Sequence, residues 1–251
     1  MTLLIKIYYT NPRESVAHAT KKNNQEKLLK KIIMTIESIK KSPLFAGIDD
    51  NDQLQAMLGC LTMRQRVYAK DEFILRAGSI ADSVGIVLLG GVYVIQEDFW
   101  GDRAILAHVG PGGVFGEAFS CTEVQSLPVS VQAAEKSEIM MIDCRKITMV
   151  CTSACAFHTR LIRNMLQILA ENNILLTRKM EYLSKRTTRE KLLSFLSAQA
   201  ALSNNSRMEL PYNRQELADY LCVNRSALSR ELSLMQKEGL IRYDKNSFEL
   251  L

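Results

Sequence analysis

The sequence predicts an α+β chain in three parts: an N-terminal double-stranded β-helix of the jelly-roll kind, a long helix, and a C-terminal winged helix-turn-helix. Three observations predict this order. Short apolar runs separated by glycine turns fill the region from about 64 to 145, which is typical of short β-strands. A long run with helical periodicity follows, from 146 to 183. Residues 213–235 then indicate two short helices joined by a tight turn.

The first 42 residues are expected to be an extension with one amphipathic helix. Residues 1–25 show no clear pattern. Residues 26–40 place isoleucines and leucines on one face and lysines on the other, and Pro43 ends the helix. We interpret the lysines as a solvated face rather than as an extra DNA contact.

Residues 43–150 are expected to form a β-roll that senses an effector. The runs 84–89, 92–96, 104–109 and 138–142 have the composition of strands. Regularly spaced strands of this length favour two sheets closed into a roll or barrel.

The long helix, placed at 151–183, carries apolar residues at alternating spacings of four and three. This pattern predicts a coiled-coil seam in a parallel homodimer, formed by Leu161, Met165, Ile168, Asn172 and Leu175. The alternative is one amphipathic helix buried within a monomer. We favour the dimer because a helix-turn-helix needs two copies to read a two-fold site.

Residues 184–251 are expected to form the DNA-binding domain, with a hinge at 184–186. Thr187 and Glu190 have the spacing of a capping box and open a helix that extends through Leu202. Asn213 and Glu216 repeat that spacing at the next helix.

The second helix of the helix-turn-helix is the candidate recognition helix. Asn224 can cap it, and Leu228, Leu232 and Met235 give it a buried stripe. The outward residues are the candidate DNA contacts, namely Arg225, Ser226, Ser229, Arg230 and Ser233. Arginine can donate two hydrogen bonds to guanine, and serine can bond phosphates or base edges. The alternative is an ordinary helical hairpin with a solvated basic face.

A wing is expected to follow. Gly239 ends the recognition helix, and the runs 240–243 and 247–251 form two strands around a turn at 244–246. The agreement of caps, turn, stripe and wing favours DNA binding over the hairpin.

Composition narrows the function further. The net charge of +5 is divided into +6 over residues 1–42, −4 over 43–183 and +3 over 184–251, as for an acidic sensor joined to a basic DNA module.

No apolar run approaches the ~18 residues of a membrane span, and the start lacks the regions of a signal peptide, so the expected location is cytoplasmic. The six cysteines are too scattered for a disulfide framework. No nucleophile elbow, phosphate loop or zinc-protease motif is present, so an enzyme is not expected.

The chain resembles the cyclic-AMP receptor protein / fumarate-nitrate regulator (CRP/FNR) superfamily over about 43–251. The matching pieces are Pro43-Leu-Phe, Gly110-Pro-Gly-Gly-Val-Phe-Gly-Glu117 and Asn224-Arg-Ser-Ala-Leu-Ser-Arg230. The resemblance implies a roll like a cyclic-nucleotide-binding domain and a bacterial, homodimeric, effector-controlled transcription factor. Its partners would be double-stranded promoter DNA and a small-molecule effector, with RNA polymerase as a further candidate and no membrane.

Two departures from the family pattern bear on specificity. Ser226 stands where the family usually has a glutamate that accepts a bond from cytosine, which leaves the preferred half-site open. Leu127-Pro128 stands where cyclic-nucleotide binders have an arginine that clamps the phosphate, and no Lys or Arg occurs between Arg103 and Lys136.

The expected effector pocket is therefore largely apolar and suits an uncharged or aromatic small molecule. Its expected residues are Phe115, Gly116, Glu117, Ala118, Phe119, Leu127, Ile174 and Leu175. No cofactor or metal is expected. Two alternatives stay open: a cyclic-nucleotide-binding regulator, and a redox- or metal-sensing regulator that uses Cys151, Cys155 and His158, which are spaced along one helical face.

Overall fold

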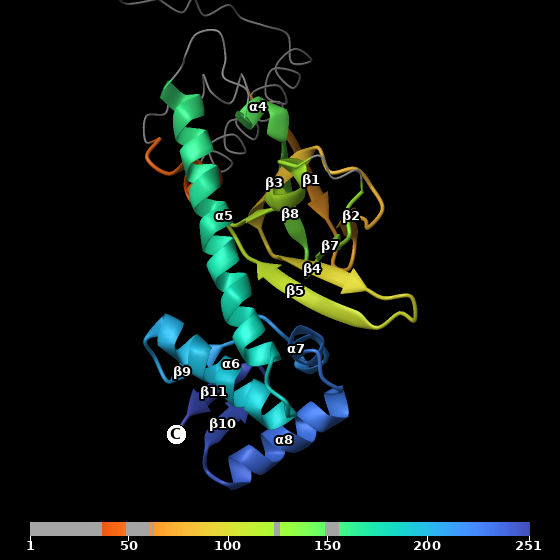
Figure 1. Cartoon of the computed structure of the whole chain (residues 1–251). Helices are drawn as coiled ribbons and strands as arrows, with labels where there is room; N and C mark the ends of the chain where they lie inside the picture. Colours follow the sequence, from red (N-terminus) through yellow and green to blue (C-terminus); the bar gives the residue numbers. More distant parts are fainter. Residues whose placement is uncertain (1–36, 49–60, 62, 123–125, 149–155) are drawn as a thin grey trace, which may run out of the picture.

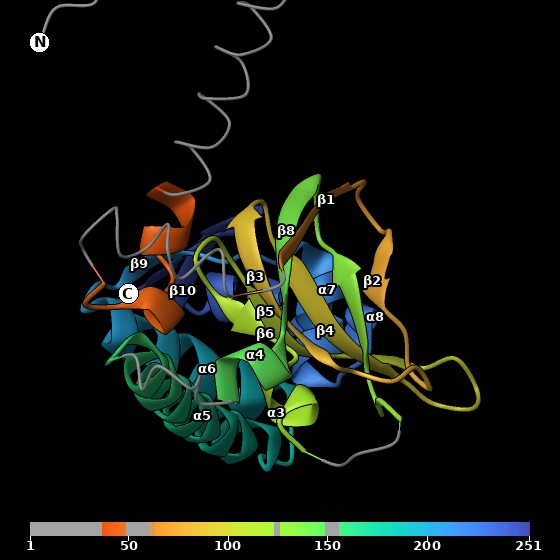
Figure 2. The same cartoon turned by 90° about the horizontal axis from the view of Figure 1, so that it is seen from above.

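The computed structural model describes residues 37–48, 61, 63–122, 126–148 and 156–251. In the described part a β-roll lies against the upper half of one long helix, α5 (Ala156–Leu183), and the C-terminal domain lies at the lower end of that helix (Figure 1). Seen along α5, the roll stands to one side of the helix (Figure 2). The α+β class, with its roll, long helix and winged helix-turn-helix, is confirmed.

The roll consists, in the described residues, of two antiparallel four-stranded sheets with the orders β1-β8-β3-β6 and β2-β7-β4-β5. Its strands are β1 (Met63–Tyr68), β2 (Phe73–Leu75), β3 (Ser83–Leu89), β4 (Val92–Glu97), β5 (Arg103–Val109), β6 (Val114–Phe115), β7 (Ser130–Ala133) and β8 (Ser137–Asp143). The four strand runs expected from sequence fall in β3, β4, β5 and β8 and are confirmed. The other four strands are short or polar, and sequence periodicity missed them.

A glycine in the roll shows how closely its layers approach. The ring of Phe115 in β6 lies over Gly85 in β3, and a Cβ at that position would stand 2.1 Å from a ring carbon. Both sheets surround this ring, which is fully buried together with Val87 and Ile139. Any larger residue at 85 would displace the aromatic side chain that closes one end of the cavity described below.

The face of α5 that begins at Leu161 is covered by the same chain. Leu161, Met165 and Ile168 are at most 5% exposed and pack against the roll and the 3₁₀ turn η1 (Pro43–Phe45). Asn164 on this face donates hydrogen bonds to the carbonyls of Leu44 and Ala46. The predicted seam is therefore wrong for these three apolar residues, because the roll of their own chain occupies the surface that a partner helix would need.

The remaining seam residues also differ from the prediction. Asn172 donates to the Glu117 carboxylate at 2.7 Å, and Leu175 is half exposed at the edge of a cavity. The helical run predicted from residue 146 is described as α4 (Cys144–Thr148) and as α5 from Ala156, and residues 149–155 between them lie outside the described part.

A second apolar stripe on α5 is exposed at three of its apolar positions, while Leu169 and Leu183 are partly buried against the hydrophobic cores. Leu166, Leu176 and Met180 are 62%, 53% and 70% exposed. Together with neighbours they alternate by four and three residues along the helix, in the order Ile162, Leu166, Leu169, Asn173, Leu176, Met180 and Leu183. We call this set the outer seam. It has the heptad spacing of a coiled coil and lies one residue further along the chain than the predicted set.

The C-terminal domain contains α6 (Thr188–Ser203), β9 (Arg207–Glu209), α7 (Arg214–Leu221), α8 (Arg225–Lys237), β10 (Ile241–Asp244) and β11 (Ser247–Leu250). The three strands form a sheet of order β10-β11-β9 among the described residues. The helices, the wing turn and the helix end at Gly239, whose φ is +75°, are confirmed. The strand β9 was missed because it has only three residues and a polar pattern.

At the N-terminus the predicted helix over 26–40 is described only at 37–40, which is helical, and the rest lies outside the described residues. None of the helices in the described part of the chain is both long and apolar enough to cross a membrane.

Candidate DNA-binding surface and effector cavity

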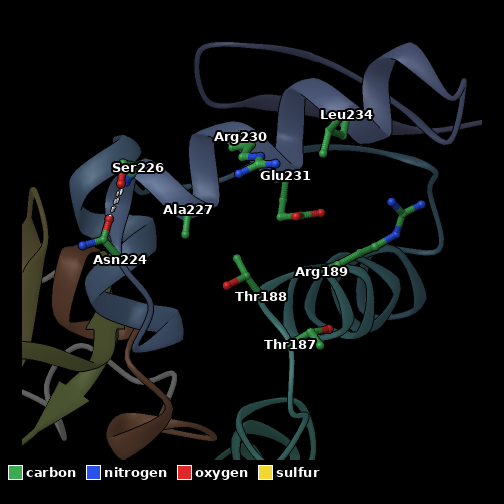
Figure 3. A pocket seen from close by; sticks show the side chains of 9 residues that line it. All are labelled: Thr187, Thr188, Arg189, Asn224, Ser226, Ala227, Arg230, Glu231 and Leu234. Atoms are coloured by element: carbon green, nitrogen blue, oxygen red, sulfur yellow. Dashed lines mark hydrogen bonds between the residues drawn. The ribbon is translucent and has the colours of Figure 1, made fainter.

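The start of α8 is held by its own side chains. The Asn224 Oδ1 accepts from the Ser226 amide at 2.8 Å and from the Ser226 hydroxyl at 2.6 Å (Figure 3). This confirms Asn224 as the cap. Because the Ser226 hydroxyl donates its proton to Asn224, the Ser226 oxygen can accept further hydrogen bonds but cannot donate one.

The outward face of α8 carries the expected DNA contacts at different exposures. Arg225 and Arg230 are exposed and Ser229 is half-buried. The exposed Ser233 donates to the carbonyl of Ser229 at 3.0 Å. Behind them Leu228, Leu232 and Met235 are fully buried, as the apolar stripe predicted. The helix is thus anchored by one face and offers two arginines on the other.

A groove of about 710 Å³ separates α8 from the start of α6. Thr187, Thr188 and Arg189 form its wall on the α6 side, and Ala227 and the Glu231 carboxylate project toward them from α8 (Figure 3). Ser226 and Arg230 also line the groove. The two walls are also tied by an ion pair between Arg189 and Glu238. Sequence reasoning did not assign the threonines or Arg189 to this surface, because only the fold brings residue 187 next to residue 226.

The wall at α6 depends on a capping box. The Thr187 side chain accepts from the Glu190 amide at 3.1 Å, and the Glu190 carboxylate accepts from the Thr187 amide at 3.1 Å. We expect Thr187→Ala to lower the free energy of unfolding by about 1 kcal/mol, since one helix cap is lost. Urea denaturation measures this. Thr188→Ala is the control, because it keeps the box, and an equal loss in both variants would contradict the assignment.

The second site is a cavity of about 500 Å³ between the roll, α5 and the C-terminal domain. Seven of the eight expected effector residues line it, namely Phe115, Gly116, Glu117, Ala118, Phe119, Leu127 and Leu175. Ile174 does not line it. That expectation is wrong, because Ile174 points to solvent on the side of α5 away from the roll and is 55% exposed.

The polar group at the centre of this lining is Glu117, the first residue of α3 (Glu117–Ser120). It is 6% exposed and accepts the hydrogen bond from Asn172. Burial raises the pKa of its carboxyl, while hydrogen bonds from its own backbone amide and from Asn172 oppose that rise. The carboxyl therefore joins the lining of this cavity directly to α5.

At its lower end the cavity reaches a joint between the roll and the C-terminal domain. The ammonium of Lys179, which is 6% exposed, donates to the carbonyls of Ile105 at 2.6 Å and Leu106 at 2.9 Å in β5. It also lies 3.8 Å from the ring centre of Tyr220 in α7. One side chain of the long helix thus contacts both domains.

Aromatic residues complete this joint. Tyr93 in β4 donates its hydroxyl to the carbonyl of Pro211 at 2.7 Å, and Tyr212 stacks on Tyr220 with ring centres 4.7 Å apart. Tyr182 shares a 2.7 Å hydrogen bond with Tyr220. Burial raises the pKa of Tyr93, Tyr182, Tyr212 and Tyr220. These rings stay neutral, so they act by packing and hydrogen bonding.

Burial lowers the pKa of Lys179 from 10.5 to about 8. Between these two values the unfolded chain binds a proton that the folded chain releases, so the free energy of unfolding rises with pH. Relative to Lys179→Met, we expect the wild-type chain to gain on the order of 3 kcal/mol from pH 8 to 10.5. Urea titrations across this range measure the difference. Parallel curves for the two proteins would contradict the lowered pKa.

The alternative metal site is tested only in part. His158 is buried, whereas Cys151 and Cys155 lie outside the described residues. Within the described ranges, the structure has no group of three His, Cys, Asp or Glu side chains placed to hold a metal ion.

Comparison with known proteins gives family matches for two stretches of the chain. A family model described as a cyclic nucleotide-binding domain matches residues 65–153, and one described as a Crp-like helix-turn-helix domain matches residues 190–251. The transcriptional activator protein anr of Pseudomonas aeruginosa is 25% identical over 214 residues, covering 83% of this chain and 84% of its own. The cAMP-activated global transcriptional regulator CRP of Pasteurella multocida is 23% identical over 185 residues, covering 69% and 83%.

Solved structures share the fold. The c-di-GMP-responsive global regulator CLP of Xanthomonas campestris superposes with a TM-score of 0.66 at 21% identity, over 80% of this chain and 99% of its own. FixK2 from Bradyrhizobium japonicum gives 0.61 at 22% identity, over 76% and 93%. At these identities the likeness supports the architecture and says nothing about which effector is bound.

Proposed function

The chain belongs to the CRP/FNR family of transcriptional regulators, and from this premise we propose that it is a cytoplasmic homodimer that binds promoter DNA under the control of a small, largely apolar effector. Members of this family are DNA-binding regulators and not enzymes. We assign sensing to residues 43–150, dimerisation to 151–183 and DNA binding to 184–251, with 1–42 as an extension. The observation that carries the proposal is α8, capped and buried on one side with Arg225 and Arg230 open on the other.

DNA reading is assigned to this exposed face. Arg225 and Arg230 are the candidates for guanine, through two parallel hydrogen bonds. The Ser226 oxygen, whose proton is held by Asn224, can only accept, so it fits the amino groups of cytosine or adenine. Ser229 and Ser233 remain candidates for phosphate contacts.

The groove between α6 and α8 supports a backbone contact beside the base contacts. Thr188 and Arg189 stand at the N-terminus of α6, where the helix dipole favours an anion. A DNA strand in this groove would place phosphate oxygens against α6 while base edges face Arg230. We therefore add Thr188 to the residues assigned to DNA, whereas the Arg189 guanidinium is already paired with the Glu238 carboxylate.

Dimerisation is assigned to the outer seam of α5. Its exposed leucines and Met180 would be covered by the same stripe of a partner helix, and Asn173 would meet its counterpart and fix the register. A parallel pair sets two copies of α8 about one turn of DNA apart, ~34 Å. RNA polymerase is a candidate partner for promoter-bound dimers.

The effector is assigned to the 500 Å³ cavity. Phe115, Phe119 and Leu127 make its wall apolar, and Glu117 offers one buried hydrogen-bonding group. An uncharged or aromatic molecule with a hydroxyl or amine fits this chemistry. A cyclic phosphate fits it less well, since the wall at Leu127 has no cation and the Lys179 ammonium already bonds two carbonyls. The other lysine or arginine of the lining, Arg178, is exposed on α5.

Residues of the roll, of α5 and of the DNA-binding domain all line the cavity, so a bound effector can change how these parts pack together. A ligand in the cavity touches Asn172 on α5 and also Tyr212 and Tyr220 of the DNA-binding domain. Any ligand that prefers one arrangement of this joint shifts the populations of the two arrangements. A nearly complete switch requires a preference of about 5.5 kcal/mol.

The test combines DNA binding with a ligand screen. Fluorescence anisotropy of labelled promoter fragments, at low salt and with each candidate effector, is expected to give saturable binding by a dimer. Melting temperatures in the presence of apolar hydroxylated compounds and of cyclic nucleotides identify the effector class. A shift by cyclic nucleotides alone would replace the apolar effector with the cyclic-nucleotide alternative. Failure to bind any promoter fragment would refute the DNA-binding assignment.

A further inference from the structure

Two cysteines meet beside the cavity. Cys121 directly follows α3, and Cys144 begins α4 at the end of β8. Their sulfur atoms lie 3.0 Å apart. Cys121 is exposed to solvent, whereas Cys144 is 2% exposed. The pair was not evident from sequence, because 23 residues separate the two cysteines and only the roll brings them together.

The contact also makes the pair reactive. Either sulfur can carry the proton of the S–H···S bond. The bond with Cys121 lowers the pKa of the Cys144 thiol to about 7, with burial opposing this, while the same bond and burial raise the pKa of the Cys121 thiol. At neutral pH the two sulfurs therefore share one proton, and only Cys121 is open to solvent. When this proton lies on the Cys144 sulfur, Cys121 carries the thiolate, which is the form that reacts with oxidants.

We propose that Cys121 and Cys144 are a redox modification site, which hydrogen peroxide converts to an intramolecular disulfide. The Cys121 thiolate attacks one peroxide oxygen, breaks the O–O bond and becomes a sulfenic acid while hydroxide leaves. The Cys144 sulfur then attacks the Cys121 sulfur, the S–S bond forms and a second hydroxide leaves. The two thiol protons convert both hydroxides to water, so two thiols are oxidised and one peroxide is reduced.

The geometry requires little movement for this step. A disulfide has an S–S length of about 2.04 Å, so the sulfurs approach by about 1 Å from their present separation. The Cys144 amide donates a hydrogen bond to the carbonyl of Asp82, which holds Cys144 in place. Cys121 directly follows α3, a helix of four residues. Cys121 is the exposed member of the pair, so α3, which it follows, is the element that shifts.

The shift acts on the effector cavity. The helix α3 carries Glu117, Ala118 and Phe119 of the cavity wall, and Glu117 bonds to Asn172 on α5. A covalent bond from Cys121 to Cys144 restrains that wall against β8. Oxidation thereby changes the stability of α3 and its contact with the long helix, whether or not DNA is present.

The full-length chain, reduced and then treated with stoichiometric hydrogen peroxide, tests the chemistry. Peptide mapping is expected to show a Cys121–Cys144 disulfide, with the loss of two thiols and of the mass of two hydrogen atoms, reversed by dithiothreitol. Cys121→Ser is expected to abolish this product. Cys222→Ser, which removes an exposed thiol in the C-terminal domain, is the matched control and is expected to retain it. Absence of the linked peptide, or its persistence in Cys121→Ser, would overturn the site.

Amide hydrogen exchange tests the coupling without relying on DNA binding. Slower exchange is expected in residues 117–121 of the oxidised wild-type chain and of Cys222→Ser, with no change in peroxide-treated Cys121→Ser. If the disulfide forms but exchange in this segment does not change, the restraint on α3 is wrong. A chain that binds no promoter but forms the disulfide would leave this site standing and refute only the DNA-binding assignment.

Discussion

A chain carrying Leu166→Glu together with Met180→Glu is expected to stay folded, to be a monomer and to bind operator DNA roughly 10²-fold or more weakly. Both side chains belong to the outer seam and neither lines the effector cavity. In a parallel pair the four glutamates would be desolvated beside like charges, which disfavours association. The monomer would then hold one half-site at a time and lose the avidity of the second. Sedimentation velocity and DNA anisotropy on the same sample measure both effects.

Ile174→Glu provides the matched control for this experiment. Ile174 is as exposed as the seam residues, on the same helix, but lies on the face away from both the roll and the outer seam. We expect this variant to remain dimeric with unchanged DNA affinity. Dimers of the double variant, or monomers of the control, would show that another surface joins the two copies.

Arg225→Lys is expected to remove the preference for the base that Arg225 reads, at ~1–3 kcal/mol, while keeping most non-specific affinity. Lysine retains the positive charge that phosphates attract, but it lacks the planar fork that donates two parallel bonds to guanine. Arg225 is exposed at the first position of α8, so the substitution disturbs no packed residue. Affinities for a consensus duplex and for single-base variants, measured at fixed salt, give the change in preference.

Lys237→Ala is a useful comparison because Lys237 is an exposed cation at the far end of the same helix. Its loss is expected to weaken binding to every sequence about equally, or not at all. If Arg225→Lys left the base preference intact, the reading role of Arg225 would be withdrawn. A uniform loss of affinity for all sequences would reassign Arg225 to the phosphate backbone.

The helix-turn-helix could be predicted from the sequence because its signals are local. The caps at Thr187, Asn213 and Asn224 each act within three residues, and the structure confirms the hydrogen bonds that define them. The buried stripe of α8 follows from helical periodicity alone. The short strands β2, β6 and β9 lack such signals, because two or three residues do not establish a period.

The long helix shows where periodicity stops being informative. Two apolar stripes lie one residue apart, one beginning at Leu161 and one at Ile162, and both have the four-three spacing of a coiled coil. The spacing cannot say which stripe the roll covers, since that depends on packing between distant segments. In the structure the roll covers the stripe of Leu161, Met165 and Ile168, which leaves Leu166, Leu176 and Met180 of the outer seam exposed.

The cavity was predictable on its roll side and not on its helical side. Phe115 to Phe119 are contiguous, so a single motif placed them together, and Leu127 joined them because it stands where the family has its phosphate-clamping arginine. Ile174 was misplaced because a one-residue error on a helix turns a side chain by 100°. Lys179 and Tyr220 were missed altogether, because their meeting depends on how the DNA-binding domain packs against β5.

Selection of bound duplexes from a random DNA pool by the purified chain, followed by sequencing, tests most directly the claim that paired copies of α8 read DNA. The account predicts a two-fold symmetric motif whose half-sites lie one helical turn apart, ~34 Å between centres. Arg225→Lys is expected to lose information at one symmetric pair of positions. A pool with no enriched motif under any effector condition, or a single asymmetric site bound by one copy, would contradict the account.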